Sequence, residues 1–411
     1  MHDNAWARAL MDAGLEVTLV PMYTPIRVDE ANNTSTRVFF GGINVYLDVY
    51  VPGWQYLPRW LTRSLDAPWL LRAVSQRGVS NNAAELGALT EATIAGPDGP
   101  QAREGEQLVN YLTQDLRPDV IVLSNVMLCG EVARIKAQFA GPVYCTLQGD
   151  DIFLDGLTEP HRTRVFARLR EIVQHLDGFL VHSQFYADYM QGYLTAPADK
   201  FHTLPLGIDC RGHTGTPRAK GTPPTIGYFA RLAPEKGLRE LVQAALILQQ
   251  RGLDFRLLAG GYLNAKQPEY WNAVQQLARP LGDRFRYAGS PDTLTEKVAL
   301  FRQFDVFSVP SPYREPKGLP ILEAWANGVP VVQPAHGHFP ELIAETGGGI
   351  TVTPGDPVAL ADGLQRMLTD EPFRRQCAEA GWNGVREQHD LPVLATATKT
   401  LLEQSLTSRH G

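Results

Sequence analysis

The chain has 411 residues, of which 44% are hydrophobic and 20% charged, with a net charge of -6. This balance is typical of a folded globular protein, and the length favours two domains of about 200 residues each. A slightly acidic chain has no general attraction for DNA or RNA, so we expect no nucleic-acid partner.

The cysteines are scattered and form no Cys-x-x-Cys pair: they are Cys129, Cys145, Cys210 and Cys377. This pattern indicates a reducing compartment without a structural metal. The sequence has no apolar run approaching about 18 residues and no signal-peptide core at its start. We therefore expect a cytoplasmic protein.

The chain begins with a predicted helix at 3–13, with Asp3 as its N-cap and Gly14 as its stop, followed by a strand at 15–21. In a doubly wound domain, a central strand and a Gly-rich loop normally precede the first helix. We therefore expect that the first domain lacks its first strand here, and that the native chain carries about 15–20 further residues before the helix.

Residues 46–74 contain three tryptophans interleaved with three arginines. An amphipathic element on a membrane surface has this composition, which would bring the protein into peripheral contact with the inner membrane. An inserted helical hairpin that packs on the first domain has it too, and we prefer that interpretation.

The rest of the chain alternates between short apolar runs and helical patterns. The strands expected in the first half are 119–125, 142–148, 178–183 and 201–206. Those in the second half are 225–231, 255–260, 284–289, 305–311 and 329–334, with helices at 237–251, 268–279, 293–304 and 319–328, and a last helix at 391–406. This alternation predicts an α/β fold with two doubly wound, Rossmann-like domains that face a cleft.

The domain boundaries follow from composition. Residues 210–221 are rich in Gly, Pro and Thr without periodicity and read as a linker. We assign 1–209 to an N-terminal domain, to which a C-terminal helix within 386–411 returns. Residues 222–385 form the other domain.

The most specific segment is 311–323, in which Glu315 and Glu323 flank a Pro/Gly turn that opens a helix. Backbone N–H groups of Gly318 and Leu319 at the helix start suit a phosphate. Glu323, one turn into the helix, suits vicinal hydroxyls such as those of ribose. Although such glutamates are usually solvated, Glu323 stands among apolar residues.

The second segment is 229–237, FARLAPEKG, in which Arg231 follows a strand and Lys236 precedes a helix. Each cation alone is ordinarily an exposed surface charge. Two cations at one strand-to-helix junction can hold a diphosphate and stabilise its charge as it leaves.

FARLAPEKG, followed about 80 residues later by EPKGLPILE, resembles the paired donor-site signatures of the retaining family-4, or group 1, glycosyltransferases with the GT-B fold. The resemblance covers nearly the whole chain in element order. It implies that 1–209 is the acceptor-side domain and 222–385 the nucleotide-sugar donor domain. It implies that Arg231 and Lys236 bind the donor diphosphate, assisted by the amides of Gly318 and Leu319.

The resemblance also implies that Glu323 binds the ribose of the nucleotide. Glu315 would face the transferred sugar near its anomeric carbon and belongs with the catalytic candidates. His336 and Gly337 replace a Gly-rich loop that usually touches the donor sugar. A sugar contact and a plain turn are both open for them.

One departure from the family concerns acceptor activation. Gln148 stands where a histidine is common, and it cannot carry a proton. Asp150 could orient an acceptor hydroxyl instead, or could be a loop or N-cap aspartate. We retain Gln148 and Asp150 as catalytic candidates.

The expected reaction is transfer of a hexosyl group, with retention and without a metal, from a nucleoside diphosphate sugar to a hydroxyl acceptor. That acceptor is a sugar, a lipid or a polysaccharide precursor. No cofactor is expected beyond the nucleotide sugar as co-substrate, and the sequence has no Asp-x-Asp, dinucleotide or P-loop motif. The rivals are a catalytically silent nucleotide-sugar-binding protein and another GT-B enzyme such as a nucleotide-sugar epimerase.

Overall fold

The computed structural model describes residues 2–22, 83–264 and 268–408. The interpretations of 46–74 lie outside these residues. Contacts divide the chain into two compact units, Met1–Leu204 with Ala395–Gly411, and Pro205–Leu394. Each unit has its own parallel sheet and its own hydrophobic core.

Among its described residues, the first unit has four parallel strands in the order β1-β2-β3-β4. The strands are β1 (Ile121–Leu123), β2 (Val143–Thr146), β3 (Gly178–Val181) and β4 (Phe201–Thr203). Every residue of β2 and β3 is buried, which explains why these strands read as continuous apolar runs rather than as alternating ones. The expected strand at 15–21 is not a regular strand, and within it only Leu19 forms a bridge.

Helices surround this sheet and complete the core of the first unit. They are α1 (His2–Asp12), α5 (Ala83–Ile94), α6 (Ala102–Asn110), α7 (Val132–Gln138), α8 (Asp150–Asp155), α9 (His161–His175) and α10 (Gln184–Leu194). Side chains such as Val173 of α9 and Met190 of α10 join Phe179 of β3 in the core.

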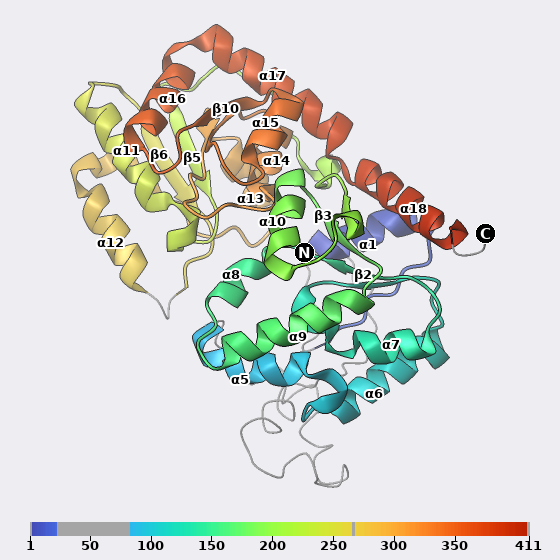
Figure 1. Cartoon of the computed structure of the whole chain (residues 1–411). Helices are drawn as coiled ribbons and strands as arrows, with labels where there is room; N and C mark the ends of the chain where they lie inside the picture. The colour runs from blue at the N-terminus through green and yellow to red at the C-terminus, as the bar shows by residue number, and fades with distance from the viewer. Residues whose placement is uncertain (1, 23–82, 265–267, 409–411) are drawn as a thin grey trace. The chain divides into compact units, whose positions relative to one another are not determined.

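The last helix, α18 (Leu391–Thr407), packs beside α1 (Figure 1). Trp6 Nε1 donates to Thr398 Oγ1 at 3.0 Å, and Lys399 Nζ donates to the carbonyl oxygen of Ala13 at 3.0 Å. These contacts join the end of the chain to its beginning, although the return to the first unit starts at Ala395 rather than at 386.

In the part of the second unit that the structure describes, six parallel strands follow the order β10-β9-β8-β5-β6-β7. They are β5 (Thr225–Phe229), β6 (Arg256–Gly260), β7 (Phe285–Tyr287), β8 (Val306–Phe307), β9 (Val331–Pro334) and β10 (Gly349–Val352). From β5 the chain runs outward to β7, then crosses to β8 on the other side of β5 and continues to β10. The strand order therefore reverses between β5 and β8, as in a doubly wound fold.

Helices cover both faces of this sheet (Figure 1). On one face α11 (Leu238–Gln250) packs against α12 (Pro268–Ala278) and α16 (Pro357–Thr369). On the other face α17 (Glu371–Gln388) packs against α14 (Leu319–Ala326) and α15 (Phe339–Thr346), and α13 (Leu294–Phe301) connects β7 to β8. The two parallel sheets confirm the predicted α/β fold class.

Residues 210–221, expected as a linker, are packed into the second unit. Residues Cys210–Gly212 form a 3-10 helix, and His213 is buried. Gly215 N donates to Asn327 Oδ1 at 3.3 Å, and Trp382 Nε1 donates to the carbonyl oxygen of Gly215 at 3.0 Å. A Gly/Pro composition without periodicity signals the absence of regular structure, but it does not show whether a segment is packed.

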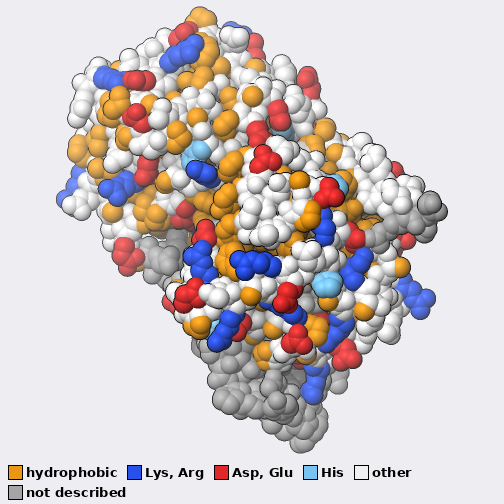
Figure 2. Space-filling model, in the orientation of Figure 1, with side chains coloured by type: hydrophobic (Ala, Val, Ile, Leu, Met, Phe, Trp, Pro, Cys, Tyr) orange, Lys and Arg blue, Asp and Glu red, His pale blue; other side chains and the backbone are white. Residues whose placement is uncertain are grey.

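In the described part of the chain, no helix combines the length and apolar character needed to cross a membrane. On the face shown in Figure 2, basic and acidic side chains are interspersed over both units.

Candidate functional site

The predicted cationic residues of the second unit lie where its strand order reverses. Arg231 and Lys236 follow β5, and Glu315 follows β8, its neighbour in the sheet. Because the carboxyl ends of parallel strands share one edge, the two loops meet there. Lys236 Nζ forms an ion pair with Glu315 Oε2, and Arg231 pairs with Glu235 in its own loop. The structure thus brings Lys236 and Glu315 together, 79 positions apart in the sequence.

Close backbone contacts hold these two loops against each other. Gly237 has a φ of +75°, and a Cβ at this position would lie 2.1 Å from the carbonyl oxygen of Pro310. Only glycine fits such a conformation and approach without strain. Ser311 Oγ lies 2.5 Å from the carbonyl oxygen of Glu235, which links the loops a second time.

The segment 336–338 supports the loop that carries Glu315. His336 Nε2 donates to the carbonyl oxygen of Ser311 at 2.9 Å. His338 donates twice, from its backbone N–H to the carbonyl oxygen of Glu315 at 2.8 Å and from Nδ1 to that of Lys317 at 2.7 Å. Burial lowers the pKa of His336, and it lowers the pKa of His338 to about 4, so both imidazoles are neutral near pH 7.

Gly337 completes this support. Its φ is +64°, and a Cβ there would lie 2.6 Å from the carbonyl oxygen of Glu315 and 2.7 Å from its nitrogen. Gly337 therefore faces the backbone of Glu315. Contact of His336 or Gly337 with a sugar stays a prediction.

The start of α14 presents backbone donors at the same edge of the sheet. Gly318, with a φ of +95°, precedes the first helical residue, Leu319. Pro320 has no N–H, and Ile321 N donates to the carbonyl oxygen of Gly318 at 2.9 Å. The N–H groups of Gly318 and Leu319 are therefore the donors offered at this end, where the helix dipole adds partial positive charge. This helix start is suited to an anion.

Glu323 lies one turn further along α14, and its side chain is only 16% exposed. Its Oε1 accepts a hydrogen bond from Lys297 Nζ of α13 at 3.0 Å. Sequence reasoning missed Lys297, although a signal existed. Lys297 stands three and four residues before the buried Leu300 and Phe301, so the pattern places a charge on the apolar face of α13.

Gln148 and Asp150 belong to the first unit, where Gln148 lies in the turn between β2 and α8 and Asp150 is the first residue of α8. Asp150 is buried, and its oxygens accept hydrogen bonds from the backbone N–H groups of Val126 (3.1 Å) and Gln148 (2.9 Å). Burial raises the pKa of Asp150 to about 6. Both carboxylate oxygens thus stabilise the turn before α8. This is the structural role that the sequence offered as the alternative to acceptor orientation. Gln148 Nε2 donates to Asp3 Oδ1 at 3.0 Å. Asp3 lies inside α1, so the prediction that Asp3 is the N-cap of this helix is wrong.

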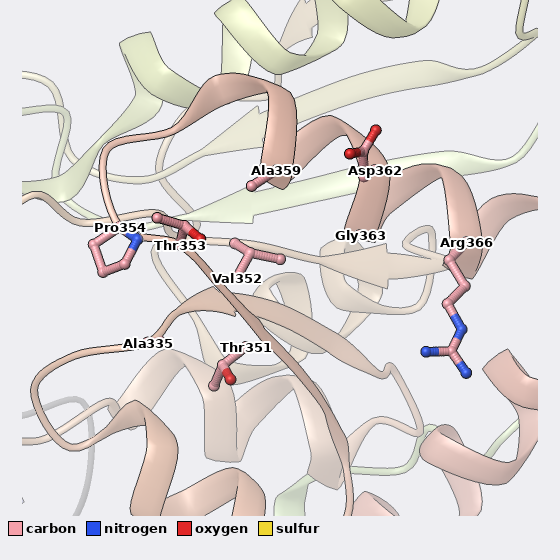
Figure 3. Close-up of a pocket in the computed structure, with 9 residues that line it drawn as sticks. All are labelled: Ala335, Thr351, Val352, Thr353, Pro354, Ala359, Asp362, Gly363 and Arg366. Carbon is pink, nitrogen blue, oxygen red and sulfur yellow. The ribbon is translucent and has the colours of Figure 1, made fainter.

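A hollow of about 590 Å³ lies elsewhere in the second unit, between β10 and α16 (Figure 3). Thr353, Asp362 and Arg366 line it together with six other residues of the same unit. None of the candidate site residues is among its lining residues in the described part of the chain, so the hollow is separate from the site.

Similarity to known families covers both units. Residues 4–207 match the family described as "Glycosyl transferase 4-like domain", and residues 215–383 match "Glycosyl transferases group 1". The chain is 31% identical over 278 residues to the D-inositol 3-phosphate glycosyltransferase of Corynebacterium urealyticum, covering 61% of this chain and 63% of the relative. It is 28% identical over 209 residues to the phosphatidyl-myo-inositol mannosyltransferase of Mycobacterium leprae, covering 50% and 54%. The matched part is thus less than two thirds of either relative.

Solved structures support the fold. Sucrose-phosphate synthase from Thermosynechococcus elongatus matches with a TM-score of 0.69 at 20% identity, over 98% of this chain and 92% of that one. HepE from Anabaena, solved in complex with UDP, matches with a TM-score of 0.62 at 17% identity, over 94% and 100%. Together with the two family matches, these similarities show that the chain has the GT-B fold and belongs to the group 1 glycosyltransferases.

Proposed function

We propose that the protein transfers a hexosyl group from a nucleoside diphosphate sugar to a hydroxyl acceptor, with retention of configuration and without a metal. The observation that carries this proposal is the ion pair of Lys236 with Glu315 where the strand order reverses, in loops that also carry Arg231 and lead into α14. Doubly wound sheets bind their ligands at this position. The names of the relatives and the UDP complex of HepE support the same substrate class.

The donor diphosphate would bind to Arg231, Lys236 and the amides of Gly318 and Leu319. Both cations pair with carboxylates, Lys236 with Glu315 and Arg231 with Glu235. A diphosphate carries more negative charge than a carboxylate and accepts several charge-assisted hydrogen bonds. Donor binding would therefore replace these ion pairs by contacts to phosphate oxygens.

The rest of the donor would lie along the same edge. Glu323 would accept hydrogen bonds from the ribose hydroxyls, and Glu315, released by Lys236, would face the sugar near its anomeric carbon. His336 and Gly337 would lie beside the sugar while they hold the Glu315 loop in place.

In the reaction, the bond between the anomeric carbon and the phosphate oxygen breaks, and its electron pair goes to the phosphate. The acceptor oxygen bonds to the anomeric carbon on the same face, and its proton passes to the leaving phosphate. Arg231, Lys236 and the helix start stabilise the charge that develops on the leaving group. No protein base is needed, which fits a glutamine at position 148.

In the first unit, Gln148 and Asp150 would act on the acceptor. Asp150 would do so by fixing the turn, because its oxygens bind backbone N–H groups. The amide of Gln148 would contact the acceptor hydroxyl. The acceptor would be a sugar, a lipid or a polysaccharide precursor, and the relatives' names favour testing inositol phosphates first. A cytoplasmic location, and membrane contact through 46–74, stay predictions.

The proposal is tested by incubating the protein with UDP-, GDP- and ADP-sugars and measuring released nucleoside diphosphate, with and without acceptors. A transferase releases nucleoside diphosphate, and the release rises with the right acceptor. A silent binding protein would show saturable binding without release. An epimerase would change the configuration of the donor sugar, and the sugar would still be attached to the nucleoside diphosphate. Either of the last two results would overturn the proposal.

A further inference from the structure

We propose that Lys297 is a positioning residue of the donor site, which holds the Glu323 carboxylate so that its second oxygen is presented to the ribose hydroxyls. The inference rests on the proposed function, because it assumes that Glu323 contacts the nucleoside. It adds a residue that lies outside both sequence motifs.

The first evidence is the enclosed ion pair. Lys297 Nζ lies 3.0 Å from Glu323 Oε1, and the two side chains are only 17% and 16% exposed. The same ammonium lies 5.7 Å from the ring centroid of Phe229, the last residue of β5. Lys297 of α13 is thus placed between an anion on α14 and an aromatic face on β5.

This enclosure distinguishes the pair from an ordinary surface ion pair. Surface pairs contribute little, because water screens them and both side chains lose freedom on pairing. In a partly buried site screening is weaker, and the Phe229 ring attracts the cation as well. The Phe229 ring is itself held by an edge-to-face contact with Phe301 of α13, the helix that carries Lys297, and the two ring centroids are 5.4 Å apart. Lys297 therefore has a defined position from which to orient Glu323.

The geometry leaves one carboxylate oxygen for a ligand. Oε1 of Glu323 accepts from Lys297, so Oε2 is the oxygen left for ribose. Without Lys297, the glutamate side chain could rotate among several conformers, and ribose binding would have to select one. Ordering a flexible side chain on binding lowers the affinity.

The backbone at Glu323 is held independently of Lys297. Asn327 Nδ2 donates to the carbonyl oxygen of Glu323 at 2.9 Å and lies 2.9 Å from Nδ1 of the buried His213. The same Asn327 accepts from Gly215 N through Oδ1. The packed segment 210–221 therefore anchors the end of α14. Loss of Lys297 should free the carboxylate without unfolding the helix.

The test compares Lys297→Met and Lys297→Arg with Arg302→Met, a matched control that removes an exposed cation just after α13. The first ligand is whichever of UDP, GDP and ADP the wild type binds most tightly, and the second is its 2′,3′-dideoxy analogue. By calorimetry, Lys297→Met should weaken binding of the ribonucleotide about tenfold, which corresponds to about 1.4 kcal/mol. Affinity for the dideoxy analogue should change less than twofold. Lys297→Arg should recover part of the loss, and Arg302→Met should bind as the wild type does.

A second comparison isolates the route through Glu323. In a Glu323→Gln background, Lys297→Met should have no further effect, because the group that it positions is gone. Equal losses for both ligands, or an undiminished loss in the Glu323→Gln background, would overturn the inference. If the wild type binds none of the three diphosphates, the proposed function fails. If it binds one and Lys297→Met behaves as the wild type does, only the role of Lys297 fails.

Discussion

The buried imidazole of His338 donates a hydrogen bond from Nδ1 to the carbonyl oxygen of Lys317, 2.7 Å away. Its backbone N–H holds the carbonyl oxygen of Glu315 at 2.8 Å. One residue of the loop after β9 thus fixes both ends of the three-residue segment that contains the catalytic candidate Glu315.

The buried state of His338 predicts a pH dependence of stability. Burial lowers its pKa from 6.5 to about 4, so as the pH falls below 6.5 the unfolded chain takes up a proton that the folded chain does not bind. The stabilisation is complete above pH 6.5 and is lost as the pH falls to about 4, by roughly 3 kcal/mol at about 1.4 kcal/mol per pKa unit. His338→Gln should lack this slope.

The measurement is the free energy of unfolding of wild type and His338→Gln at several pH values between 4 and 7, taken as a difference between the two proteins. The difference is needed because Asp150 and Glu131 oppose the trend. Burial raises their pKa values to about 6 and about 7, so their ionisation destabilises the fold as the pH rises. Parallel curves for the two proteins would contradict the prediction.

A second prediction concerns Gly337, whose absent side chain makes room for the Glu315 backbone. Gly337→Ala adds a Cβ 2.6 Å from the carbonyl oxygen of Glu315 at a φ of +64°. We expect a loss of a few kcal/mol in stability and a fall in kcat of at least tenfold, because Glu315 must move.

Gly355→Ala is the matched control, since Gly355 has a φ of +71° and no atom within 4 Å of the added Cβ. It should cost only the backbone strain, about 1–2 kcal/mol, and leave kcat unchanged. If both variants lose activity equally, the close approach to Glu315 does not matter for the reaction.

A third prediction separates donor binding from turnover. Because Lys236 pairs with Glu315, Glu315→Gln should free the lysine and tighten binding of a nucleoside diphosphate several-fold. The same variant should nearly abolish transfer. Calorimetry and a turnover assay measure the two effects.

Glu235→Gln offers the contrasting variant, because it frees Arg231 without touching the residue near the sugar. It should tighten binding and retain turnover. Weaker binding in both variants would mean that these carboxylates assist the diphosphate rather than compete with it.

A fourth prediction concerns Asp150 in the first unit. An asparagine at this position keeps one acceptor oxygen and places an amide against the second backbone N–H, so Asp150→Asn should lower the stability of the first unit by about 1–3 kcal/mol. The measurement is the free energy of unfolding of the first unit, taken from chemical denaturation and from the hydrogen exchange of backbone amides in α8. An unchanged stability would argue that the carboxylate is held for the acceptor rather than for the turn.

The pattern of residues alone could predict most strands of the fold and part of the candidate site. Buried parallel strands such as β2 and β5 are continuous apolar runs, and Glu323 stands out as a charge within an apolar helix. The edge strand β10 was missed, because Gly349–Val352 is short, Gly-flanked and only half-buried, and so lacks a strong strand pattern.

Other features depend on contacts between distant segments. The packing of 210–221 depends on Asn327 and Trp382, more than 100 residues away. The roles of His336 and His338 depend on carbonyl groups of another loop, and no local pattern identifies such acceptors. The sequence places Lys297 on the apolar face of α13, but only the fold identifies Glu323 as its partner.

The most direct test of the central claim is a thermal-shift panel of UDP-, GDP- and ADP-sugars on the wild type and on an Arg231→Ala, Lys236→Ala double variant. A ligand at about 100 times its dissociation constant adds roughly 2.7 kcal/mol of apparent stability, so the wild type should melt several degrees higher with at least one donor. The folded double variant should show little shift, because each charge-assisted contact contributes about 1.5–3 kcal/mol. A wild type that responds to none of the donors, or a double variant that responds equally, would contradict a nucleotide-sugar site at the β5 and β8 strand ends.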